Sequence, residues 1–197
     1  MTMIQLHGDI GAVFSPDDAL TANRHVYLLR HGETDLNAQG VLQGSIEADL
    51  NARGRAQAEA AAKQMRNLGL QRIISSPQRR AVQTAEIIAD HLQLPVETQA
   101  SLRERSWGPY EGRPREEAVA DAEGVEPLSA LRERAVTALR DIVSGSASKT
   151  LIITHSGLVR ELISVLDCGY SERIENCQLL SLSLTIAEST GGDSDAV

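Results

Sequence analysis

Two apolar runs that each end in a histidine constrain this chain more than any other feature. Residues 26–29 run straight into Arg30 and His31, with a glycine next. Residues 150–154 repeat the pattern and run into His155. Buried parallel strands are typically continuous apolar runs, and their carboxyl ends open together onto the edge of a sheet where ligands bind. The two histidines are therefore expected to share one site at one sheet edge.

The rest of the chain alternates between strand and helix patterns. Asn51 is placed to cap a helix that runs to about residue 68, and Ser76-Pro77 opens a second helix to about residue 92. Apolar residues at helical spacing predict a third helix over 128–142. Further expected elements are a short strand at 72–75, an extended piece at 95–98, a helix at 157–166 and an edge strand at 179–186. Such alternation predicts an α/β fold, a three-layer α/β/α sandwich with a mostly parallel sheet.

We expect a single domain over residues 25–190. A chain of 197 residues is long enough for one proper hydrophobic core. Residues 1–24 are expected to form an N-terminal extension that packs loosely on the domain, and residues 191–197 a flexible tail. Residues 35–49 are expected to be a loop. The irregular stretch around 104–127, rich in glycine and proline, is expected to form a small cap.

The overall charge and the cysteines argue against several classes of protein. A formal net charge of −8 is a poor match for nucleic acid or an anionic membrane surface, so neither partner is expected. No signal peptide or membrane-spanning run is apparent, and Cys168 and Cys177 lack metal or disulfide spacing, which favours a cytoplasmic location. The oligomeric state is not readable, although the edge strand at 179–186 leaves a homodimer possible.

The polar residues near the predicted strand ends suit phosphoryl chemistry. Arg30 and Arg80 carry guanidinium forks that match a tetrahedral oxyanion. A neutral imidazole such as His31 can attack phosphorus, and a carboxyl group such as Glu104 can supply and recover the proton. Arginines beside the histidines would repel a metal ion, so no metal or other cofactor is expected. Phosphate-binding loops of the GxGxxG or GxxxxGK[ST] type follow no predicted strand, which disfavours a nucleotide-binding protein.

Five short motifs follow one another in order along the chain. They are residues 29–34 (LRHGET) with Asn37, residues 42–44 (LQG) with 50–54, residues 75–85 (SSPQRRAVQTA), residues 102–105 (LRER) with Gly108 and 111–112, and residues 154–157 (THSG). Together, over residues 26–186, they resemble the histidine phosphatase superfamily, which is also called phosphoglycerate mutase-like. The resemblance implies a phosphoglycerate mutase-like fold with a small cap insertion.

The same resemblance implies a role for each matching residue. His31 would be the nucleophile that becomes phosphohistidine, and Glu104 would be the proton donor. The phosphoryl group would be bound by Arg30, Arg80 and His155. Further substrate-binding positions would be Asn37, Gln43, Gly44, Ser156 and Gly157. Backbone N–H groups at the start of a helix after His155 would add anion donors.

Simpler explanations remain open for some of these residues. Asn37 could serve only to form its loop, and Glu104 could be a solvated surface carboxylate in an acidic stretch. Trp107 is expected to be a wall of the pocket or a plug in the small cap, where Arg113 and Arg115 suit a small phosphomonoester. Arg105 and Arg113 could reach a second anionic group on the substrate, or be exposed to solvent.

The spacing of the motifs favours a hydrolase over a mutase. His155 follows Glu104 by 51 positions, and a helix takes up about a third of this interval. A cap this thin would leave a phosphohistidine open to water. The expected function is therefore a metal-independent phosphomonoesterase acting on a small phosphorylated metabolite, such as a sugar phosphate, a phosphoglycerate derivative or ribazole phosphate. The alternatives are a phosphoglycerate mutase, a protein phosphohistidine phosphatase and a catalytically silent phosphate-binding module.

Overall fold

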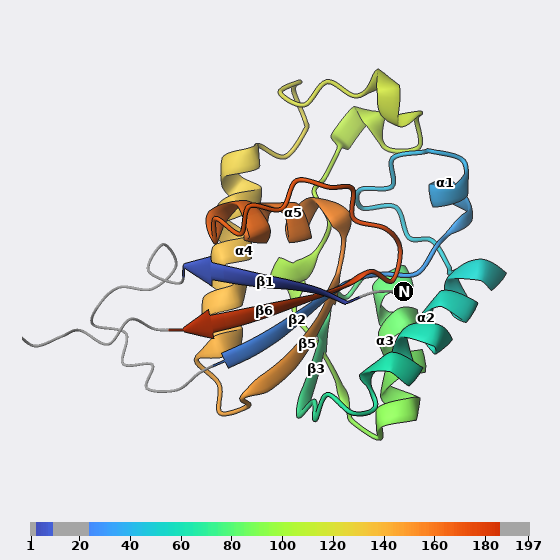
Figure 1. Cartoon of the computed structure of the whole chain (residues 1–197). Helices are drawn as coiled ribbons and strands as arrows, with labels where there is room; N and C mark the ends of the chain where they lie inside the picture. Colours follow the sequence, from blue (N-terminus) through green and yellow to red (C-terminus); the bar gives the residue numbers. More distant parts are fainter. Residues whose placement is uncertain (1–2, 10–23, 186–197) are drawn as a thin grey trace, which may run out of the picture.

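The computed structural model describes residues 3–9 and 24–185, which form a six-stranded sheet between two layers of helices (Figure 1). The strands are β1 (Ile4–Asp9), β2 (Arg24–Arg30), β3 (Arg72–Ser75), β4 (Val96–Thr98), β5 (Lys149–Thr154) and β6 (Leu179–Thr185). Their order across the sheet is β1-β6-β2-β5-β3-β4. All neighbours are parallel except β2 and β6, which are antiparallel. The predicted α/β sandwich with a mostly parallel sheet is confirmed.

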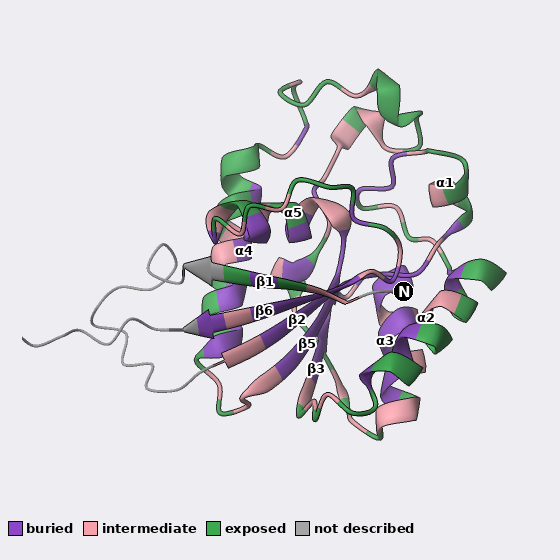
Figure 2. Cartoon of the chain, in the orientation of Figure 1, coloured by how far each residue is buried: buried purple, intermediate pink, exposed green. Residues whose placement is uncertain are grey.

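The helices cover the sheet on both faces. They are α1 (Asp35–Ala38), α2 (Ala52–Met65), α3 (Arg79–Leu92), α4 (Leu128–Val143) and α5 (Ser156–Val165), and short 3-10 turns occupy Ala100–Leu102, Gly108–Tyr110 and Arg115–Glu117. Alternate strand residues divide between two cores. Leu28 and Ile152 pack with α4 and α5, whereas Leu29 and Ile153 pack with α2 and α3. Because both faces are covered, the central strands are buried along most of their length (Figure 2).

The two central strands end level with each other. In the parallel β2–β5 pair, Arg30 lies opposite Thr154, so the residue that follows each strand emerges at the same sheet edge. The His31 N–H continues the ladder by donating to the Thr154 carbonyl at 2.9 Å. The apolar runs therefore deliver both histidines to one edge, as expected.

Two of the predicted helices begin or end at slightly different residues. Asn51 caps α2 by accepting a hydrogen bond from the Gly54 N–H at 2.8 Å, but the helix ends at Met65. Helix α3 begins at Arg79 and not at Pro77, because Gln78 keeps an extended backbone. The loop at 35–49 also contains a short helix, α1, which Thr34 and Asn37 close with a reciprocal capping box.

The predictions for the N-terminal segment and for β6 are wrong where the structure describes them. Ile4–Asp9 form strand β1, which pairs in parallel with β6, so this part of the extension belongs to the sheet. Strand β6 lies inside the sheet between β1 and β2. The leucines that alternate with its serines pack into the core with α4 and α5, so the alternation indicates a packed face and not a free edge. Strand β6 is therefore not free to pair with a second copy. Residues 10–23 and the predicted tail at 191–197 lie outside the described residues.

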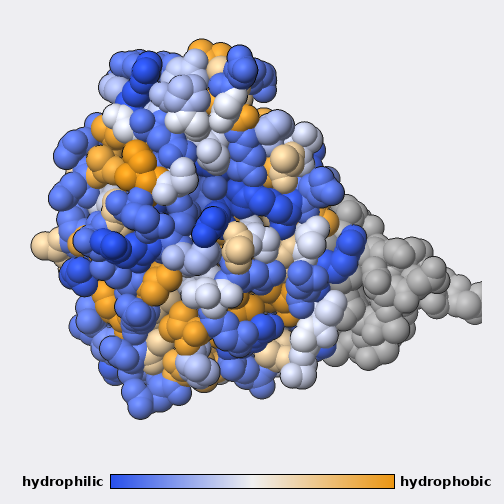
Figure 3. Space-filling model, turned by 180° about the vertical axis from the view of Figure 1, so that it is seen from behind, coloured by the Kyte–Doolittle hydropathy of each residue, from blue (hydrophilic) through white to orange (hydrophobic). Residues whose placement is uncertain are grey.

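The cap projects above the sheet at the top of Figure 1, where residues 104–127 run as turns and 3-10 segments before α4 begins. The face that is turned away from the viewer in Figure 1 presents mainly hydrophilic residues, with smaller hydrophobic patches between them (Figure 3). Large exposed hydrophobic side chains within the described residues are Val119 in the cap and Leu128 at the start of α4. None of the helices in the described part of the chain is long and apolar enough to cross a membrane.

Candidate active site

A small polar pocket of about 80 Å³ opens at the carboxyl ends of β2 and β5, beneath the cap. Nine of the residues predicted for the site line it: Arg30, His31, Asn37, Gln43, Gly44, Arg80, Glu104, Ser156 and Gly157. His155, the tenth, is completely buried, and its ring centroid lies 5.1 Å from that of His31. The structure thus gathers segments from four separate parts of the sequence around one pocket.

His31 is held as a neutral imidazole with one defined tautomer. The Nδ1 atom of His31 lies 2.7 Å from the carbonyl oxygen of Gly32. A carbonyl oxygen can only accept a hydrogen bond, so Nδ1 carries the hydrogen. Nε2 then carries the lone pair and accepts a hydrogen bond from Arg80 Nε at 3.3 Å. Burial lowers the pKa of His31 well below 6.5, and the nearby charges of Arg80 and Arg30 lower it further. At neutral pH the ring therefore presents an unprotonated nitrogen to a cationic surrounding.

His155 lies beside His31 and has one ring nitrogen without a partner. Its Nε2 lies 2.8 Å from Ser76 Oγ, whereas its buried Nδ1 has no hydrogen-bond partner among the described residues. Burial, followed by the charge of Arg80, lowers the pKa of His155 well below 6.5. Buried polar atoms are normally paired, so this nitrogen is available for a ligand.

The two arginines are fixed by main-chain carbonyls and supply the positive charge of the site. Arg80, on the first turn of α3, donates to the carbonyls of Ile46 and Gly44 at 2.8 and 2.9 Å. Arg30 donates to the Ile174 carbonyl at 2.7 Å, and its buried Nε has no partner in the described structure. Burial lowers the pKa of Arg30 to about 10, so it stays protonated at neutral pH. Fixed cations with an unsatisfied donor define an anion-binding floor.

Glu104 faces this floor from the first residue of the cap. Its own N–H donates to Gln78 Oε1 at 2.9 Å, which fixes its backbone next to the start of α3. Its carboxylate accepts a hydrogen bond from Arg105 N–H at 2.9 Å and lies 3.4 Å from the Gly157 nitrogen. A Cβ atom at Gly157 would overlap Glu104 Oε1, so the close approach depends on glycine at this position.

The remaining predicted residues divide between the pocket wall and its support. Gln43 is buried, and its Oε1 has no hydrogen-bond partner among the described residues. The carbonyl of Gly44 holds Arg80, and its positive φ of 49° favours glycine. Asn37 lines the pocket while its Oδ1 accepts from the Thr34 N–H and from Asn176 Nδ2, so it also stabilises its loop.

Arginines outside the ten predicted site residues also line the pocket. Arg160 on α5 was not anticipated from the sequence, whereas Arg115 lies in the cap, where a phosphomonoester was expected to bind. Trp107 also lines the pocket, which fits the wall and not the plug. Arg113 is exposed and does not line the pocket, and Arg105 is buried with its guanidinium on the carbonyls of Glu126 and Ala120. The one available sequence signal for Arg160 was its position one helical turn after Ser156, which places both on one face of α5.

The donor types within the described chain do not form a metal site. No group of three or more histidine, cysteine, aspartate or glutamate side chains comes together in residues 3–9 and 24–185 in a way that could hold an ion. The groups that face the two histidines are instead arginines. The donor set therefore fits an anion.

Fold and site together define an α/β protein with two neutral histidines and two arginines at the carboxyl edge of its sheet. The family model of the histidine phosphatase superfamily (branch 1) matches residues 26–197, and the chain belongs to this family. The resemblance seen in the sequence motifs is therefore confirmed.

Named relatives include both phosphatases and mutases. The chain is 32% identical over 169 residues to the uncharacterized phosphatase PhoE of Bacillus subtilis, with 83% of this chain and 87% of PhoE covered. It is 35% identical over 176 residues to GpmB of Yersinia pestis, which carries a phosphoglycerate mutase name, with 78% and 82% covered. The solved structure of Bacillus stearothermophilus YhfR superimposes with a TM-score of 0.70 at 26% identity, covering 78% of this chain and 87% of that one.

Proposed function

We propose that the protein is a metal-independent phosphomonoesterase that acts on a small phosphorylated metabolite through a phosphohistidine intermediate on His31. One observation carries the proposal. The unprotonated Nε2 of His31 lies against Arg80 in a pocket that also contains Arg30 and Glu104. A nucleophile, two cationic side chains that can donate hydrogen bonds to phosphate, and a proton donor thus lie around a single small cavity.

The first half of the reaction transfers the phosphoryl group to the enzyme. His31 Nε2 attacks phosphorus, the ester P–O bond breaks, and the Glu104 carboxyl group donates its proton to the leaving oxygen. The Gly32 carbonyl holds Nδ1–H and stabilises the positive charge that develops on the ring. Arg30, Arg80 and the unpaired Nδ1 of His155 bind the equatorial oxygens, where charge accumulates in a loose transition state.

The second half releases phosphate. Water attacks the phosphohistidine on the side from which the alcohol departed, and the Glu104 carboxylate takes its proton. The P–N bond breaks and returns His31 to the neutral imidazole. Neither step needs a metal ion, because the arginines stabilise the negative charge of the phosphoryl group.

The open cap supports hydrolysis over transfer to a second substrate. Residues 113–117 of the cap are all exposed to solvent, and the cap contains only short turns. Water therefore has access to the intermediate. Arg115 and Arg160, both exposed at the mouth of the pocket, favour a substrate with a further anionic group beyond the transferred phosphate.

The test is hydrolysis of p-nitrophenyl phosphate in the presence of EDTA by the wild type, His31→Ala and His91→Ala. His91 is a matched control because it lies in the last turn of α3, does not line the pocket and pairs with Glu59 at the surface. We expect turnover by the wild type and His91→Ala, and none by His31→Ala. An acid-labile ³²P label that appears on wild-type protein but not on His31→Ala would identify the intermediate.

Two results would contradict the proposal. Loss of wild-type activity on chelation would show that a metal ion is required. Exchange between 2- and 3-phosphoglycerate much faster than phosphate release would assign the protein to the mutases.

A further inference from the structure

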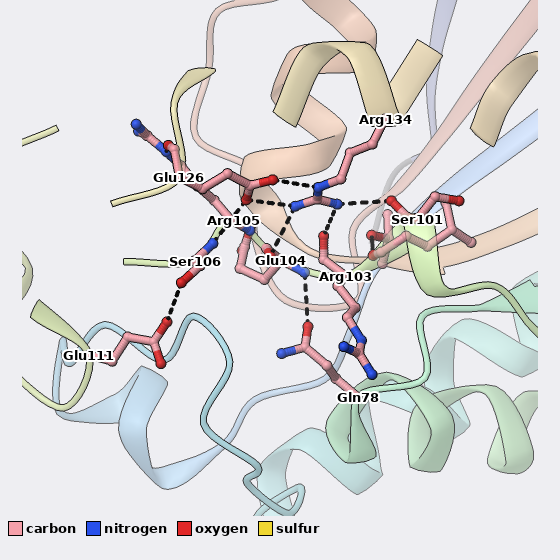
Figure 4. Close-up of polar contacts among 11 residues, drawn as sticks. Gln78, Ser101, Arg103, Glu104, Arg105, Ser106, Glu111, Glu126 and Arg134 are labelled. Atoms are coloured by element: carbon pink, nitrogen blue, oxygen red, sulfur yellow. Dashed lines mark hydrogen bonds and ion pairs between the residues drawn. The ribbon is translucent and has the colours of Figure 1, made fainter. Parts of the chain in front are cut away.

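Arg134, on the second turn of α4, does not line the pocket, yet every N–H of its guanidinium group has an acceptor (Figure 4). Nε and Nη2 donate to the two carboxylate oxygens of Glu126 at 2.7 and 2.9 Å. Nη1 donates to the carbonyls of Ser101 and Arg103 at 2.8 and 2.6 Å, and Nη2 also donates to the Glu104 carbonyl at 3.1 Å. All five donors of the planar fork are used at once.

The three carbonyls belong to the segment that carries Glu104 into the site. This segment lies outside the strands and α-helices, so its carbonyls have no sheet or helix ladder to satisfy them. Arg134 takes the place of such a ladder. Glu104 is then held from two sides, because its N–H bonds Gln78 and its carbonyl bonds Arg134.

Glu126 fixes Arg134 and closes the base of the cap. Its Oε2 also accepts from the Ser106 N–H at 3.0 Å, and its main-chain N–H donates to the Ser106 carbonyl at 2.9 Å. Burial raises the pKa of Glu126, but hydrogen bonds from Arg134 and the Ser106 N–H bring it below its usual value. The carboxylate stays charged at neutral pH, and the Glu126–Arg134 pair is only 18% and 23% exposed at its side chains.

We infer that Arg134, oriented by Glu126, is a positioning residue for the Glu104 carboxyl group. The inference rests on the proposed function, in which Glu104 protonates the leaving oxygen. A proton donor must lie within about 2.6–3.2 Å of its acceptor, and a misplacement of about 1 Å can cost on the order of 100-fold in rate. Lysine cannot replace this arginine, because one ammonium cannot bind a carboxylate in bidentate fashion and hold three carbonyls in a plane.

The experiment compares two leaving groups in wild type, Arg134→Lys and Glu126→Gln. The probes are p-nitrophenyl phosphate, whose leaving group is stable as an anion, and β-glycerol phosphate, whose alkoxide must be protonated. We expect kcat/KM for β-glycerol phosphate to fall about 10- to 100-fold in Arg134→Lys, with a much smaller change for p-nitrophenyl phosphate. The comparison uses kcat/KM because this ratio covers only the steps up to departure of the alcohol, whereas kcat also contains hydrolysis of the phosphohistidine, in which Glu104 serves both probes alike. The inhibition constant of inorganic phosphate should change little, because Arg30 and Arg80 keep their own contacts. Glu126→Gln should show the same selectivity with a smaller loss.

A matched control and a double variant make the result specific. Arg132→Lys, two residues away on the same helix, alters only an exposed pair with Glu161 and should behave as the wild type. If Arg134 acts through Glu104, adding Arg134→Lys to Glu104→Gln should cause no further loss on β-glycerol phosphate.

Three outcomes would contradict parts of this picture. An equal fall in kcat/KM for both probes would overturn the positioning role, as would additive losses in the double variant. If Arg134→Lys does not fold, Glu126→Gln carries the same test, because the amide keeps the shape of the carboxylate. A wild type inactive on both probes would overturn the proposed function itself, whatever the variants do.

Discussion

At the scale of single residues, Gly157 decides how close the proton donor comes to the helix that follows His155. The Glu104 carboxylate occupies the space that any side chain at residue 157 would fill. The backbone of Gly157 has no positive φ, so a side chain here would disturb the Glu104 carboxylate and not the backbone. Helix α5 and the cap therefore meet at an atom that takes part in the proposed chemistry.

Gly157→Ala is expected to lower kcat for an alkyl phosphate by roughly 10- to 100-fold, because the new methyl group displaces the Glu104 carboxyl group. The variant should not lose stability, since alanine favours a helix over glycine by about 1 kcal/mol. Steady-state kinetics with β-glycerol phosphate and the midpoint of thermal unfolding check both halves. Gly145→Ala, whose methyl group would meet only the flexible end of Arg72 and the Ile142 carbonyl, is the control. A fully active Gly157→Ala would show that the contact does not matter.

Much of the site could be predicted at this scale, and the reason is local. His31 and His155 follow apolar runs, and Arg80 lies within a motif that begins a helix. Short stretches of sequence therefore suffice to identify these three residues. The tautomer of His31 could not be predicted, because it depends on the turn that brings its ring to the Gly32 carbonyl. Arg160 was missed, and Arg115 could not be told from Arg113, because the way the cap lies over the sheet edge decides which arginines face the pocket.

At the scale of secondary structure, β1 shows what local patterns cannot report. Ile4 and Leu6 alternate with polar residues, as in a strand. The partner of β1 is β6, however, which comes about 170 residues later in the sequence, on the order of the whole domain. Leu6 packs into the core formed with α4 and α5, alongside Leu182 and Leu184. The central strands were predictable because each has an unbroken apolar run at its middle, whereas the pattern of β1 is recognised only once its partner is known.

Leu6→Ala should lower the free energy of unfolding by about 2 kcal/mol, because it removes a buried side chain at the border of that core. The value of kcat should stay the same, since the pocket lies on β2 and β5. Urea unfolding and p-nitrophenyl phosphate hydrolysis measure the two effects, with the exposed neighbour Gln5→Ala as control. An unfolding free energy equal to that of the wild type would show that β1 contributes nothing to the domain.

At the scale of the whole molecule, the site makes stability depend on pH. The pKa values of His31 and His155 are both well below 6.5 in the folded protein and return to about 6.5 on unfolding. As the pH falls below 6.5, the unfolded chain binds protons that the folded protein does not, so stability decreases. Each histidine contributes a slope of up to about 1.4 kcal/mol per pH unit, which is present until the pH falls to its folded pKa.

Urea unfolding of the wild type should therefore show a falling free energy between pH 6.5 and pH 5. This window lies above the usual glutamate pKa of about 4.5, so Glu97, Glu111 and Glu126, whose folded pKa values are lowered, contribute little to it. His31→Ala removes one of the two groups and should reduce the slope by about half. A flat profile in the wild type would mean that the histidines accept protons in the folded state.

The ion pair at the base of the cap has a consequence for how this protein could diversify. Ser106 and Glu126 are joined to each other and close the base of the cap. Residues 112–115 of the cap are tied again to the main chain of Gly40 and Leu42. Doubling the length of such a closed loop costs only about 0.6 kcal/mol in chain entropy. Insertions at the exposed residues 116–117, beyond the contacts to Gly40 and Leu42, would therefore change the cover of the pocket while leaving the residues beneath it in place. Changes of cap length and sequence between Ser106 and Glu126 could therefore alter which substrate is accepted while the catalytic residues below the cap stay the same.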